Sequence, residues 1–168
     1  LHSACFNHRQ GRRGGRAMDA AGSLYVADKN NFASRKVDLK EGIVSTFAGR
    51  PPDQPRRAMP TDGSALEARY HSGGGPTTIV YDRTRDRFYV HSDDERWFRV
   101  ILRGPGGWEV RTGGIREEPR GPRFPALRPR SNLWEPAWAA GVPGKTRVID
   151  GLPAGVDAQG NLYLINYK

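Results

Sequence analysis

Cysteine is almost absent from this sequence, since Cys5 is the only one among 168 residues. No intrachain disulfide can therefore form. Cys5 has His2 nearby but no second cluster of ligands, so we do not expect a metal site at this end of the chain. Apolar runs are also short. None approaches the roughly 18 consecutive residues of a membrane-spanning helix, and we expect any contact with a membrane to be indirect.

The chain is also poor in hydrophobic residues, which make up 36% of it, while 21 Gly and 13 Pro interrupt the sequence. This composition favours many short strands and turns over long helices. The length suits one ordinary domain. Because the sequence does not begin with Met, we expect a processed form or a fragment of a larger protein.

Positive charge exceeds negative charge, with 27 Lys and Arg against 18 Asp and Glu and a net charge of +9. Such an excess can attract nucleic acid, anionic polysaccharide or acidic protein surfaces. The other interpretation is a solvated surface, because most basic residues are arginines spread along the chain and often adjacent to acids. We favour the second interpretation.

One phrase recurs three times: "GSLYVADKNN" at 22–31, "DRFYVHSDDE" at 86–95 and "GNLYLINYK" at 160–168. Each alternates with the period of two that is typical of a strand, and each follows a shorter strand that ends in Asp. The unit is a β-hairpin. Asp19, Asp82 and Asp157 either fix these turns by hydrogen bonds to the backbone or form a carboxylate cluster, and we favour the turns. For the aromatics we favour packing between units over a binding ladder: Tyr25, Tyr89 and Tyr163.

Two further strands, joined by a Gly-rich turn, follow each of the first two hairpins. Four antiparallel strands form one blade of a β-propeller. We therefore predict an all-β fold of propeller-like blades in an incomplete or open ring, because the third unit stops after two strands. The predicted strands are 23–27, 34–39, 43–47, 77–82, 87–91, 97–102, 107–111 and 161–165. The predicted segments are a basic arm 1–16, blades at 17–50, 76–114 and 151–168, and Pro-, Gly- and Arg-rich insertions at 51–75 and 115–150.

The run "AMDAAGSLYVADKNNFASRKVDLKEGIVSTFAG" resembles an NHL repeat of the bacterial propeller type. "TDGSALEARYHSGGGPTTIVYD" is similar to the segment between blades in that family, with Asp62, Gly63, Ala65, Ala68, Arg69 and Tyr70 at matching positions. Phe32 and Ala33 depart from the family pattern, and the repeats are spaced more widely than usual. The resemblance implies a propeller and favours a periplasmic or secreted bacterial location. Some relatives bind RNA, and others are lyases or hydrolases with an axial metal.

Candidate site residues fall into two groups. The insertion 115–150 combines arginines with tryptophans in a Pro-rich context, and we expect it to be an extended arm that contacts a partner. The predicted partner-binding residues are Arg116, Arg120, Arg123, Arg128, Arg130, Trp134 and Trp138. Loops at one end of the blades give a second group of candidates, because propellers usually bind ligands there. These are Lys29, Asn30, Asn31, Asp93, Asp94 and Arg96.

The leading functional hypothesis is a non-catalytic protein-interaction or structural module, a subunit or fragment that docks in a larger assembly. One alternative is binding of nucleic acid or another anionic polymer by a basic face. Another is a fragment of a metal-dependent propeller lyase or hydrolase. His71 and His91 lie in no paired ligand spacing such as HxH, so we predict no catalytic residue, no metal site and no cofactor, and we identify no small-molecule substrate.

The contact arm leads to a direct prediction. Deletion of 116–147 should weaken assembly with a partner but leave the blade strands folded, because the arm is not expected to contribute to the core. Circular dichroism would follow the strands, and sedimentation of the assembly would follow binding. Unfolding of the whole chain on deletion would instead make this segment part of the core.

Overall fold

The computed structural model describes residues 14–50, 60–70, 75–92, 98–113 and 152–165. Its first sheet contains β1 (Arg16–Met18), β2 (Leu24–Asp28), β3 (Ala33–Asp38) and β4 (Ile43–Ala48) in chain order, all antiparallel. The predicted strands 23–27, 34–39 and 43–47 agree with β2, β3 and β4 to within one residue, and β1 had been expected only as a shorter strand without stated bounds. β1 begins at Arg16, the last residue that the sequence assigned to the basic arm.

The second sheet repeats this meander with β6 (Thr78–Asp82), β7 (Arg87–His91), β8 (Phe98–Gly104) and β9 (Gly107–Thr112). A fifth strand, β5 (Gly63–Ser64), pairs with the outer edge of β9. The sequence did not predict β5, because two residues are too few to show alternation. The third sheet is the hairpin of β10 (Leu152–Val156) and β11 (Leu162–Ile165).

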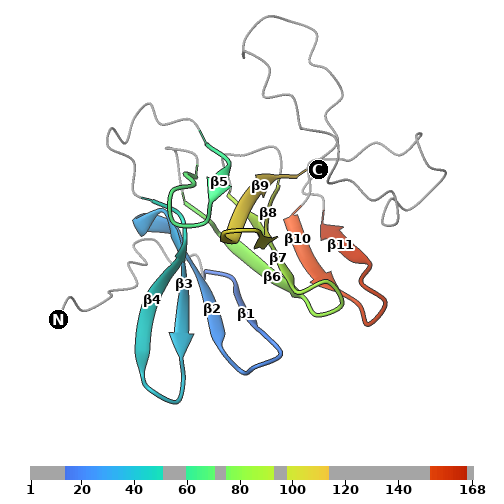
Figure 1. Ribbon diagram of the computed structural model, residues 1–168. Helices are drawn as coiled ribbons and strands as arrows, with labels where there is room; N and C mark the ends of the chain where they lie inside the picture. Colours follow the sequence, from blue (N-terminus) through green and yellow to red (C-terminus); the bar gives the residue numbers. More distant parts are fainter. Residues whose placement is uncertain (1–13, 51–59, 71–74, 93–97, 114–151, 166–168) are drawn as a thin grey trace, which may run out of the picture.

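The three sheets stand side by side in chain order, in the manner of blades (Figure 1). The first hairpin strands of the three sheets lie next to one another, with β1 against β6 and β6 against β10. The backbone of Gly15 donates to Thr77 O at 2.7 Å. A Cβ on Gly15 would lie only 2.6 Å from Thr78 Cα, so this close approach requires glycine. The predicted all-β class, the four-strand meanders and the open arrangement are confirmed.

Each hairpin turn is built on an aspartate, as the sequence predicted. Oδ1 of Asp19 accepts the backbone N–H groups of Ala21 and Ser23 at 3.0 and 2.9 Å. Asp157 does the same with two N–H groups of its own turn, at 3.0 and 2.8 Å. Asp82 accepts from Thr84 and Arg85 in a turn that is one residue longer. These bonds satisfy backbone donors that the strand ladders leave open.

An aromatic cluster fills the junction between the first two sheets. Tyr25 and Phe47 come from the first sheet, and Phe88 and Trp108 from the second. The ring centroids of Tyr25 and Phe88 lie 4.4 Å apart, and those of Phe47 and Trp108 lie 5.2 Å apart. A smaller cluster of Tyr89, Phe98 and Leu162 joins the second sheet to the third. The core therefore lies between sheets, and each sheet depends on its neighbour.

The segment 60–70 connects the first two sheets through hydrogen bonds to β9 and to the residues that follow β4. Its backbone accepts from Gly49 and Arg50 at the end of the first sheet, and Ala65 N donates to Trp108 O in the second. The buried guanidinium of Arg99 donates to the carbonyls of Arg69 and Thr61 and to the carboxylate of Asp62, at 2.6 to 3.0 Å. The side chains of Ala65, Ala68 and Tyr70, which belong to this segment, are buried. The stretch that resembles an inter-blade segment thus bridges two sheets.

Within the described part of the chain, no helix is long and apolar enough to cross a membrane.

Truncation of Phe88 tests the junction between the first and second sheets. Phe88 is fully buried and contacts aromatic rings of both sheets. We expect Phe88→Ala to lower the free energy of unfolding by about 3–5 kcal/mol, because it leaves a cavity in the core. Ile43→Ala, at an exposed position, should cost less than about 0.5 kcal/mol. Urea unfolding measures both, and equal effects would contradict a core located at this junction.

Candidate functional site

Most of the residues that the sequence proposed as a site fall outside the described residues. These are Arg116, Arg120, Arg123, Arg128, Arg130, Trp134 and Trp138 of the arm, and Asp93, Asp94 and Arg96 of the second loop. Lys29, Asn30 and Asn31 are described, and they form the short 3-10 helix η1 (Lys29–Asn31).

The η1 loop is held by hydrogen bonds to Asp28 of β2 and to Gly75. The Asn31 side-chain amide donates to both carboxylate oxygens of the buried Asp28, at 3.0 and 2.8 Å. Gly75 N donates to Lys29 O at 3.1 Å. A Cβ on Gly75 would lie 2.3 Å from that same oxygen, so only glycine fits this approach. Through these contacts the loop connects the first sheet to the residues that lead into β6.

The aspartates of the hairpin turns have a second role that the sequence did not predict. Each uses its other carboxylate oxygen to accept the hydroxyl of the tyrosine on the next strand. The hydroxyl-to-carboxylate distance is 2.9 Å for Tyr25 and Asp19, 3.3 Å for Tyr89 and Asp82, and 3.0 Å for Tyr163 and Asp157. The spacing of these residues, six or seven positions in each unit, was the signal that could have revealed the pairs.

The three tyrosines differ sharply in exposure although their local geometry is the same. Tyr25 is 2% exposed and Tyr89 is 1% exposed, because the following sheet covers each of them. The predicted packing role is confirmed for these two. Tyr163 is 56% exposed. It lies on the outer side of the third sheet, at the position that faces the next sheet in the other two units.

The opposite side of each sheet carries an apolar row that runs across the strands. In the second sheet the row is buried or half-buried against the first sheet, and it consists of paired residues Tyr81, Phe88, Ile101 and Val110. Val156 and Leu162 are the matching pair in the third sheet, packed on the second. The first sheet has the same row in the same register: Met18, Leu24, Val37 and Val44.

The row of the first sheet has no sheet in front of it among the described residues. Met18 is 54% exposed, and its three partners are half-buried. The structure thus has two outer faces of complementary kind. We call the Met18–Leu24–Val37–Val44 row the leading face, and the side of the third sheet that carries Tyr163 the trailing face. These faces are the candidate functional site.

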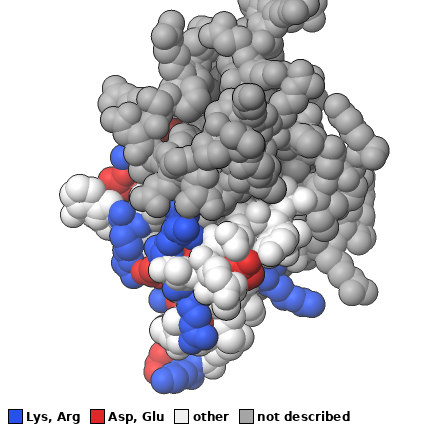
Figure 2. Space-filling model, turned by 90° about the vertical axis from the view of Figure 1, so that its right-hand side faces the viewer, with Lys and Arg blue, Asp and Glu red and all other residues white. Residues whose placement is uncertain are grey.

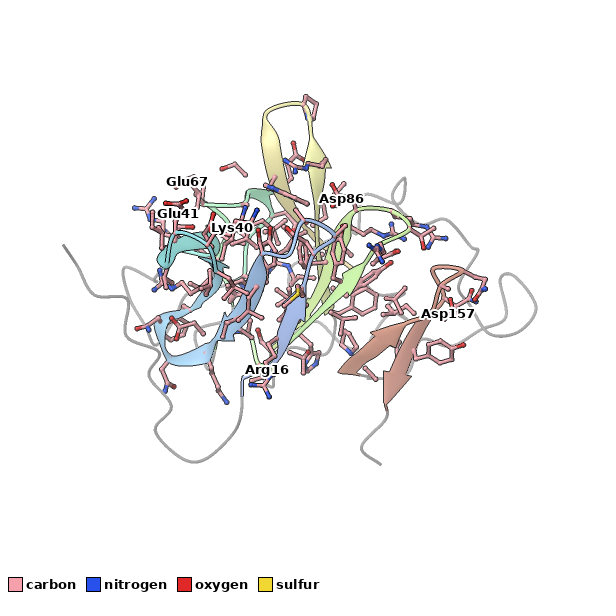
Figure 3. All side chains as sticks on the ribbon, turned by 90° about the horizontal axis from the view of Figure 1, so that it is seen from below. Arg16, Lys40, Glu41, Glu67, Asp86 and Asp157 are labelled. Carbon is pink, nitrogen blue, oxygen red and sulfur yellow. The ribbon has the colours of Figure 1, made fainter. Side chains whose placement is uncertain are left out.

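Arginines of the described residues are mostly paired with carboxylates. Arg35 lies 3.0 Å from Asp28, Arg99 lies 2.8 Å from Asp62, and Arg87 lies 3.2 Å from Asp82. Figure 2 shows Lys and Arg interspersed with Asp and Glu over the part of that view that is not grey. In Figure 3, Asp86 and Asp157 lie at the turns of neighbouring hairpins. This mixture fits a solvated surface better than a continuous basic face.

Among the residues that the structure describes, no group of three or more His, Cys, Asp or Glu side chains is placed to hold a metal ion. The hairpin aspartates are engaged in their own turns. The hydrogen bonds of Asp19, Asp82 and Asp157 therefore agree with the prediction that these residues fix the turns, rather than form a carboxylate cluster.

Comparison with known proteins gives no match, either among protein-family models or among curated proteins.

The buried Tyr89 makes stability sensitive to alkaline pH. Burial raises the pKa of Tyr89 to about 12, the charge of Asp82 adds to this, and Arg87 opposes it. The hydrogen bond to Asp82 also requires a protonated hydroxyl. Because the pKa is higher in the folded state, the stabilisation is complete below pH 10 and is lost as pH rises toward about 12.

We therefore expect the free energy of unfolding to fall above pH 10, and to fall less steeply in Tyr89→Phe, which cannot ionise. Urea unfolding at pH 8 and at several values above 10 measures this slope. Tyr163→Phe is the matched control, because its ring is exposed and its ionisation should affect folding less. Identical slopes in Tyr89→Phe and the unmodified chain would show that Tyr89 does not titrate with folding.

Proposed function

We propose that this chain is a non-catalytic protein-interaction and structural subunit, an NHL-like propeller segment that docks in a larger assembly through its leading and trailing faces. One observation carries the proposal: Tyr163 is exposed at a position where Tyr25 and Tyr89 are buried by a neighbouring sheet. A tyrosine with its hydroxyl already bonded and its ring exposed is well suited to an interface, where aromatic anchors supply much of the binding energy.

Three features support the architecture in this proposal. The hairpin with its Asp–Tyr pair occurs in all three sheets. The sheets follow one another in chain order, and β6 contacts both β1 and β10. The segment with Asp62 and Arg69 bridges two consecutive sheets. Each of these is what stacking of one repeated unit predicts.

Within the part of the chain that the structure describes, the charge pattern gives less support to anionic partners. Phosphate binding needs cations that are free to contact the backbone of a nucleic acid. Arg35, Arg87 and Arg99 already pair with carboxylates inside the fold. The Met18–Leu24–Val37–Val44 row of the leading face is aliphatic, and the trailing face carries the exposed ring of Tyr163. Such side chains suit a protein surface.

Photo-crosslinking tests the proposed docking. A photoreactive amino acid replaces Tyr163 or Met18 in the full chain, expressed in its own cells, and mass spectrometry then identifies the adducts. We expect protein adducts from both positions because both faces are covered in the assembly. The control position is Leu39, which is equally exposed but lies beside the β3–β4 turn. Absence of protein adducts at 163 and 18, or equal yield at 39, would refute docking through these faces.

A further inference from the structure

The two outer faces are complementary to each other, and this identifies a partner. At the first internal junction, a tyrosine packs on the apolar row of the following sheet, as Tyr25 does on Phe88. At the second, Tyr89 lies in one cluster with Leu162 of the following row. The trailing face carries the equivalent tyrosine, Tyr163, and the leading face carries the equivalent apolar row. The surface that Tyr163 fits is therefore the row of Met18, Leu24, Val37 and Val44.

We infer that the occupant of each outer face is a second copy of this chain, bound head to tail, so that Tyr163 of one copy packs on the Met18–Leu24–Val37–Val44 row of the other. This rests on the proposed function, because it names the partner for the same two faces. Two copies bring six of the sheets that the structure describes, four of them with four or more strands, and propellers close at about 4–8 blades.

The aspartate-bound hydroxyl favours this contact in the same way as inside the chain. Asp157 holds the hydroxyl of Tyr163 at 3.0 Å and the Asn161 amide at 2.8 Å. The ring can therefore be buried by a neighbour without an unsatisfied polar group. On the other face Met18 is the exposed member of the row, opposite Leu24 in the β1–β2 pair. Its flexible thioether side chain adapts readily to an aromatic ring.

A head-to-tail contact joins two different faces, and this provides a specific test. The first variant, Tyr163→Arg, blocks the trailing face, and the second, Met18→Arg, blocks the leading face. Both positions are exposed in the single chain, so both variants should fold, which circular dichroism and urea unfolding would verify. The matched controls are Tyr163→Phe and Met18→Leu, which keep the apolar contact, and Leu39→Arg, which adds the same charge elsewhere.

Sedimentation of the purified full chain over a concentration series measures association. The unmodified chain and all three controls should form a species of twice the 18.7 kDa chain mass. Each Arg variant alone should associate at least about tenfold more weakly, because it loses a central anchor at both junctions of the pair. An equimolar mixture of the two Arg variants should recover association, since one intact junction remains between them.

Several results would overturn the inference. A chain that stays monomeric at the highest concentration has no second copy as partner. If Tyr163→Arg and Met18→Arg each associate as strongly as the unmodified chain, association uses some other surface. If the equimolar mixture of the two variants associates no better than either variant alone, the contact joins like faces. If photo-crosslinking at 163 yields adducts with a different protein and none with a second copy, the docking function stands and the identity of the partner is wrong. If it yields no protein adduct at all, both proposals fail.

Discussion

The structure depends on one repeated contact, in which a tyrosine on the second strand of a sheet packs against the next sheet. The contact works because the aspartate of the preceding turn holds the tyrosine hydroxyl. A buried phenol without a partner would cost free energy. The same carboxylate also binds backbone N–H groups of the turn. Turn geometry and packing between sheets are therefore coupled through a single side chain, and a change at Asp19 would weaken both.

The second constraint is the fully buried charge of Arg99, which organises the segment between the first two sheets. A buried guanidinium needs hydrogen-bond acceptors close by, because removing its charge from water is costly. Here two carbonyls and the Asp62 carboxylate accept from it. The segment that supplies those acceptors cannot move away without leaving the charge unpaired. This explains why a stretch with little regular structure, apart from β5, joins the sheets so closely.

The sequence was sufficient for features that depend on local chemistry. Period-two alternation located the strands, and the aspartates located the turns, because both effects involve residues close together in the chain. Apart from the packing of Tyr25 and Tyr89 between sheets, contacts between distant residues were not predicted. Nothing in "WFRVILR" indicates that Arg99 is buried beside Asp62 rather than exposed. The sequence around Trp108 likewise does not indicate that its ring contacts Phe47. The loop at Lys29–Asn31 was expected only as a candidate at the end of the blades where propellers usually bind ligands. The hydrogen bond from Gly75 N to Lys29 O joins residues far apart in the chain, and no local sequence pattern predicts it.

The repeated contact also explains why binding should concentrate at the ends of the described array. In a stack of similar units, each inner unit satisfies its neighbours, and only the outermost faces remain open. Repeat proteins that stand alone usually carry polar residues on these faces. Here the leading face keeps the apolar row of an inner unit, with Met18 more than half exposed, and the trailing face keeps the junction tyrosine. The chain therefore retains, at both outer faces, the same side chains that hold its own sheets together, and this retention is the physical basis for expecting another sheet there.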